Sequence, residues 1–143
     1  MSLIALSMGG CAPRYDTRGA AAGTLPVGDP KTFLLVSEDR SHALGADTAV
    51  ARLLEARGFR QAPDAAYRVD VALASSETDI ALAGAAQRRD VLSLCKRRRY
   101  ALSVAMIERR TGKVLYRRDA ETRRCGTPAP GLVDGLAEAA LAR

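Results

Sequence analysis

Few side chains in this 143-residue sequence could perform catalysis. Its one histidine, His42, lies in the polar stretch 38–42, and an imidazole of ordinary pKa could act as a general base. The sequence contains no Gly-x-Ser-x-Gly, His-Glu-x-x-His, Cys-x-x-Cys or Gly-x-Gly-x-x-Gly motif beside which that base would act. We therefore expect His42 to be a solvated loop residue in a protein that has no active site and no cofactor.

Two of the three cysteines are spaced in a way that predicts a disulfide. Arg110 lies between two strand-like runs, 100–107 and 114–120. Cys95 precedes Arg110 by 15 residues and Cys125 follows it by 15 residues, so the cysteines flank the two runs. Folding the chain about Arg110 brings the two thiols together at the open end of a hairpin, where an exported protein would oxidise them. The alternative is a pair of buried free thiols in a cytoplasmic protein. Two cysteines and one distant histidine cannot complete a tetrahedral metal site.

Positive charge is concentrated in the same segment. The chain has 22 basic and 16 acidic residues, a net charge of +6, yet residues 88–124 hold 13 basic and four acidic side chains, so this segment alone is +9. The candidate anion-binding residues are Lys96, Arg97, Arg98, Arg99, Arg117, Arg118, Arg123 and Arg124.

Strand alternation divides these basic side chains between two faces, with Arg97 and Arg99 on one face and Lys96 and Arg98 on the other. Pairing of the two strands would place Arg98 or Arg99 near Arg123 or Arg124. Two interpretations stay open. The residues either bind an anionic partner, such as lipopolysaccharide phosphates, anionic lipid headgroups or an acidic protein, or they form a solvated rim that discourages edge-to-edge association.

The third cysteine follows an apolar run and two glycines, in Met1-Ser-Leu-Ile-Ala-Leu-Ser-Met-Gly-Gly-Cys11. This arrangement resembles the end of a bacterial lipoprotein signal, in which small residues precede a cysteine that becomes lipidated. The resemblance implies that 1–10 is part of a signal. Two alternatives stay open: the true start lies upstream of Met1, or Cys11 is an incidental residue of a frayed N-terminus. Residues 11–30 are rich in Ala, Gly and Pro, which predicts a flexible linker. The globular domain is then expected over 31–143.

Two patterns predict a strand and a helix at the start of that domain. The apolar run 32–36 is typical of a buried strand, and apolar residues at helical spacing over 46–57 predict a helix. Gly58 follows the helix, which would place Leu54 and Phe59 as the hydrophobic pair of a Schellman ending.

The remaining elements complete a small α/β domain. Alternating apolar residues over 67–74 predict a half-buried strand, Gly112 predicts the turn of the hairpin, and apolar residues after Pro130 predict a terminal helix. The polar stretch 75–90 is expected to be a wide loop. The order β-α-β-β-β-α predicts a two-layer α/β sandwich, in which two helices cover one face of a mixed four-stranded sheet.

Several of these features together resemble the small uncharacterised lipoproteins of Gram-negative envelopes, some of them domains of unknown function. They are Cys11, the helix ending 54–59, the run 67–71 and the hairpin 107–116. The resemblance spans about 32–142 and implies a domain tethered to the periplasmic side of the outer membrane, a location that Ala12 after the cysteine would suit. No catalytic residue comes with it.

The sequence thus favours a non-enzymatic, lipid-anchored envelope adaptor or assembly factor, attached to the membrane through Cys11. The alternative is a cytoplasmic nucleic-acid-binding module that uses the basic segment. Only six of the 143 residues are aromatic, which disfavours base stacking, and no predicted helix is basic enough for recognition. We therefore expect no nucleic-acid partner.

Overall fold

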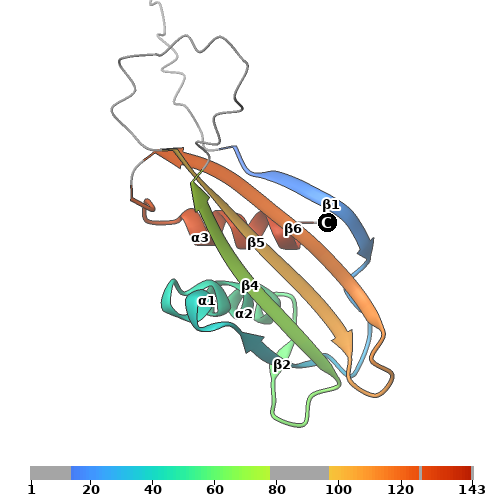
Figure 1. Cartoon of the computed structure of the whole chain (residues 1–143). Coiled ribbons are helices and arrows are strands. Elements are labelled where there is room, and N and C mark those ends of the chain that lie inside the picture. Colours follow the sequence, from blue (N-terminus) through green and yellow to red (C-terminus); the bar gives the residue numbers. More distant parts are fainter. Residues whose placement is uncertain (1–13, 78–96, 126, 143) are drawn as a thin grey trace, which may run out of the picture.

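The computed structural model describes residues 14–77, 97–125 and 127–142, which form one sheet covered by helices on one face (Figure 1). The sheet has six strands in the order β1-β6-β5-β4-β2-β3. The elements are β1 Asp16–Gly23, β2 Thr32–Ser37, α1 Asp39–Ala43, α2 Ala46–Glu55, β3 Arg60–Gln61, β4 Tyr67–Glu77, β5 Arg97–Glu108, β6 Val114–Cys125 and α3 Leu132–Leu141. The predicted α/β class is confirmed, whereas the predicted four-stranded sheet is wrong because β1 and β3 extend its two edges.

The core lies between the helices and one face of the sheet. Every second residue of β5 is almost fully buried, from Tyr100 to Met106, because neighbouring side chains of a strand point to opposite faces. Leu54 of α2 and Leu136 of α3 belong to the same buried cluster. The opposite face of β5 carries the small, partly exposed residues Ala101, Ser103 and Ala105.

The first helical crossover is as the sequence predicts. Strand β2 pairs in parallel with β4, and α2 lies between them in the chain. The Phe59 amide donates to the Leu54 carbonyl at 3.1 Å and the Gly58 amide to the Glu55 carbonyl at 2.9 Å, which are the two hydrogen bonds of a Schellman ending. Gly58 has a φ of +84°, a conformation that glycine adopts without steric cost.

The hairpin forms, but its register differs from the predicted one. Arg97 lies opposite Cys125 and Met106 opposite Tyr116, with an irregularity before Ile107. Cys125 therefore faces a residue two positions away from Cys95, which itself lies outside the described residues. The difference arises at the turn, where the Gly112 amide donates to the Glu108 carbonyl and the strands fold about residue 111 rather than 110.

Residues 16–23, which we expected to be part of a flexible linker, form the edge strand β1. It pairs antiparallel with β6, and the Thr122 hydroxyl donates to the Arg14 carbonyl at 2.8 Å just before it. Tyr15 lies so close to Gly135 of α3 that a side chain at position 135 would overlap its ring. An edge strand is held by backbone hydrogen bonds and needs no apolar periodicity. Its composition can therefore be the same as that of a linker.

Two other local predictions are corrected. His42, expected in a loop, lies in the short helix α1, and residues 75–77, expected in a wide loop, extend β4. The rest of that predicted loop, 78–90, lies outside the described residues. Within the described part of the chain, every helix is too short or too polar to cross a bilayer.

We expect Gly23→Ala to destabilise the fold, because Gly23 has a φ of +75° and a methyl group there would overlap the Leu115 carbonyl of β6. Gly28→Ala is the matched control, since Gly28 also has a positive φ but has free space around it. Urea denaturation should show a loss larger by about 1–3 kcal/mol for Gly23→Ala, as is typical of overpacking. Equal losses would contradict the docking of β1 on β6.

Candidate anion-binding sites

The only histidine of the sequence pairs with a carboxylate. His42 Nδ1 lies 2.5 Å from Asp47 Oδ2, and the Thr48 amide donates to Asp47 Oδ1 at 2.7 Å. The hydrogen bond that His42 donates to Asp47, and the negative charge of that carboxylate, raise the pKa of His42. Burial alone would raise the pKa of Asp47, but its bonds to His42 and Thr48 lower it instead.

The hydroxyl next to His42 in the chain is engaged elsewhere in the fold. Ser41 is fully buried, and its Oγ accepts a hydrogen bond from the Leu73 amide at 2.8 Å. Among the described residues, no three His, Cys, Asp or Glu side chains come together as a metal site.

The open end of the hairpin carries what we call the arginine cluster, made of Arg97, Arg98, Arg99, Arg123 and Arg124. Cross-strand pairing sets Arg98 opposite Arg124 and Arg99 opposite Arg123, so the predicted proximity of these side chains is confirmed. Lys96, the neighbouring candidate in the sequence, lies outside the described residues.

Two glutamates partly neutralise the arginine cluster. Arg98 forms an exposed ion pair with Glu77 at 3.3 Å, and Arg99 pairs with Glu121, which is buried. Like charges directly across a ladder repel, so these carboxylates allow the strands to pair at this end. Arg123 is exposed and has no ion pair within the described part of the chain. Arg124, its neighbour in β6, also forms no ion pair among the described residues.

Arg117 and Arg118 do not join the arginine cluster. They lie in the first half of β6 and, as predicted from alternation, point to opposite faces of the sheet. Arg117 is exposed on the face without helices, opposite Ala105. Arg118 is on the helix side, where it donates to the Ala142 carbonyl at the end of α3 and lies over the Tyr116 ring.

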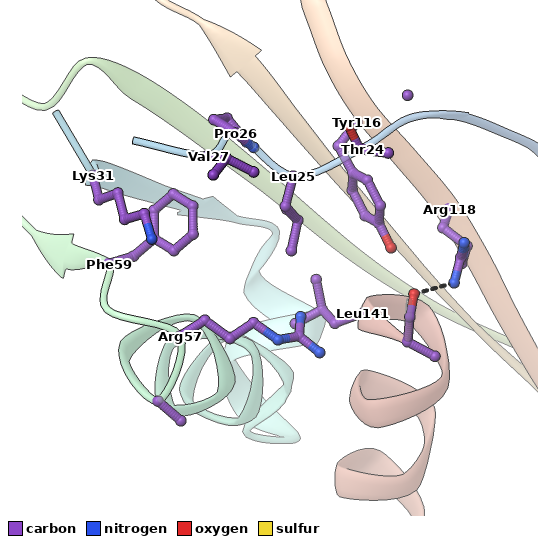
Figure 2. Close-up of a pocket in the computed structure, with 13 residues that line it drawn as sticks. Thr24, Leu25, Pro26, Val27, Lys31, Arg57, Phe59, Tyr116, Arg118 and Leu141 are labelled. Atoms are coloured by element: carbon purple, nitrogen blue, oxygen red, sulfur yellow. Dashed lines mark hydrogen bonds between the residues drawn. The ribbon is translucent and has the colours of Figure 1, made fainter. Parts of the chain in front are cut away.

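Arg118 also lines a groove of about 610 Å³ at the far end of β1 (Figure 2). The segment that leaves β1 forms one wall, and the C-terminal ends of α2 and α3 form the other. Leu25 and Val27 come from the first wall and Leu141 from the second, while Phe59 and Tyr116 lie between them.

Three basic side chains surround this groove, and none of the described residues that line it is acidic. Lys31 lies over the Phe59 ring at 5.7 Å, and Arg57 extends from the end of α2 toward Leu141 (Figure 2). The sequence does not mark Lys31 or Arg57 as site residues, because neither belongs to a run of basic residues. Only the fold brings them to Arg118.

The fold defines a class of protein: a two-layer α/β domain with an antiparallel hairpin at the centre of a mixed sheet and helices on one face. Among solved structures, the PelC dodecamer from Paraburkholderia phytofirmans superposes with a TM-score of 0.53 over 90% of this chain and 96% of its own, at 18% identity. Lipoprotein GNA1162 from Neisseria meningitidis gives 0.50 over 77% and 94%, at 15% identity.

The predicted resemblance to lipoproteins of Gram-negative bacteria is thus confirmed at the level of the fold. No protein-family model matches the sequence, and no curated protein matches it.

We expect an NMR titration to give a pKa above 6.5 for His42, and Asp47→Asn to bring it back toward that value. Asp64→Asn, which removes an exposed carboxylate elsewhere, should leave it unchanged. The raised His42 pKa stabilises the fold below 6.5 and the lowered Asp47 pKa does so above 3.8, so Asp47→Asn should cost most stability between these pH values. An unshifted His42 in the unaltered protein would contradict the pair.

Proposed function

We propose that this protein is a non-enzymatic, lipid-anchored adaptor or assembly factor of the Gram-negative envelope, on the periplasmic side of the outer membrane, whose arginine cluster rests on an anionic lipid surface. The observation that carries the proposal is the position of the start of β1. Asp16 lies opposite Glu121 of β6. Two residues further along β6, on the same face of the sheet, Arg123 lies opposite Arg99 of β5. The chain therefore enters the fold beside the arginine cluster (Figure 1).

Cys11 is close to this point in the sequence. Only four peptide units separate it from Tyr15, which is docked against α3, so a lipid on Cys11 would lie within about 14 Å of Tyr15. A linker of 20 residues would let the domain move freely above a membrane, whereas this short connection would hold the start of β1 near the bilayer. The open end of the hairpin would face the same surface.

Lipid and charge would then act together. One acyl chain alone gives weak and reversible membrane binding, and a basic patch beside it supplies the second signal that stable anchoring needs. Each Lys or Arg near an anionic surface contributes about 1 kcal/mol. The charges of Arg123 and Arg124, which form no ion pair within the described residues, therefore suit anionic headgroups better than an acidic protein, because a headgroup surface is already present at the anchor.

We also propose the Cys95–Cys125 disulfide at the same end. Cys125 is the last residue of β6, and Cys95 precedes the first residue of β5 by two positions. Chain that has just left a strand is free to depart from the ladder, so the difference of two positions in register still permits the bond. It would close a loop of about 30 residues, which stabilises a fold by about 3–4 kcal/mol in the chain-entropy model.

One experiment tests all three cysteines. We expect the intact mass of protein from the membrane fraction to include acyl chains, and Cys11→Ser to remove them. Alkylation without reduction should leave Cys95 and Cys125 unlabelled, and alkylation after reduction should label both. An unmodified Cys11, or free thiols at 95 and 125 before reduction, would contradict the corresponding part of the proposal.

The arginine cluster is tested with the unacylated chain, Cys11→Ser, on vesicles that contain phosphatidylglycerol. Replacing Arg98 and Arg123 by Gln should weaken binding by about 2 kcal/mol, or roughly thirtyfold. The matched control replaces Arg110 and Lys113, two exposed cations at the turn of the hairpin, and should bind as the parent does. Vesicle sedimentation measures both, and higher salt should weaken the parent. Equal losses in the two double variants would exclude a specific role for the cluster.

A further inference from the structure

We propose that the groove at the far end of β1 binds an amphiphile with a phosphate head group and a single alkyl chain. The groove is lined by residues from four separate segments, the stretch 23–31, the region 56–59 after α2, β6 and the end of α3. It lies at the Gly23 end of β1, whereas the arginine cluster lies near the Asp16 end. The inference goes beyond the proposed membrane contact and does not depend on it.

The charge around the groove favours an anion. Lys31, Arg57 and Arg118 line it without an acidic neighbour in the lining, and within the described residues none of them forms an ion pair. Because α2 and α3 both end here, their dipoles each place about half a negative charge at the groove. These offset about one of the three positive charges, so a net positive site remains.

Arg57 points most directly to a phosphate group. Its Nη1 is buried without a hydrogen-bond partner, and no other nitrogen of its guanidinium donates a hydrogen bond to the described part of the chain. A buried donor left without an acceptor is unfavourable, and such groups are rare in folded proteins. Phosphate oxygens match the planar guanidinium and accept two of its N–H groups at once. By contrast, Arg118 already donates to the end of α3.

The rest of the groove favours an alkyl chain. Phe59 and Leu141 form its buried apolar floor, while Leu25 is partly exposed and Val27 at its edge is 96% exposed. Inorganic phosphate would satisfy Arg57 but leave the exposed apolar surface of Leu25 and Val27 in contact with water. An alkyl chain attached to the phosphate would cover it, at about 0.8 kcal/mol for each buried methylene.

The experiment is calorimetric titration of the full chain carrying Cys11→Ser with dodecyl phosphate below its micelle concentration. Dodecyl maltoside provides the same chain on a neutral head, and inorganic phosphate provides the head alone. We expect dodecyl phosphate to bind more tightly than either, and octyl phosphate to bind more weakly, by about fourfold for each methylene that is buried. Arg57→Gln should weaken dodecyl phosphate binding by about tenfold or more.

Arg60→Gln is the matched control, because Arg60 is an exposed cation of β3 that does not line the groove. Arg57→Gln should melt at the temperature of the parent, since no hydrogen bond of Arg57 is lost; if it melts lower, Lys31→Gln replaces it as the test. Equal affinity of parent and variant, tighter binding of the maltoside, or inorganic phosphate binding as tightly as dodecyl phosphate would each overturn the proposal. The Arg98 and Arg123 double variant should bind dodecyl phosphate normally, so failure of the membrane contact is distinguishable from failure here.

Discussion

The pairing of β5 with β4 on one side and β6 on the other is the constraint on which the rest of the structure depends. From Arg98 to Ile107 every residue of β5 has a partner on both neighbours, so its two faces are set by position alone. The helices bury the face of β5 that carries Tyr100 and every second residue after it. The residues that alternate with these must then point to the opposite face of the sheet. Consecutive arginines are therefore separated by the sheet, and no single face can collect all of the basic residues.

The same register explains why some arginines are held in ion pairs within the fold while others are exposed to a binding partner. Glu121 is buried, and an unpaired buried carboxylate is costly, so the ion pair with Arg99 is part of the fold. Arg123 lies across the ladder from Arg99, and its exposed guanidinium has no ion pair among the described residues. Two neighbouring arginines on one face thus have different roles, since Arg99 holds a buried carboxylate and Arg123 remains exposed.

Local patterns were predictable from the sequence because they are determined by neighbouring residues. The Schellman ending at Gly58, the hairpin turn at Gly112 and the terminal helix after Pro130 each rest on a few adjacent side chains. The strand β1 was not predictable in this way. It is held by pairing with a strand about 100 residues later, and its alanines and glycines are also what a linker would contain.

The unpredicted strand also creates the groove. Once residues 16–23 are paired with β6, the chain leaves the sheet at Gly23 on one edge and must reach β2, the strand next to the opposite edge, by Thr32. That return takes residues 24–31 past the C-terminal ends of α2 and α3, where helix dipoles favour cations. Lys31, Arg57 and Arg118 meet there because of the topology, so spacing along the sequence carries no sign of the site.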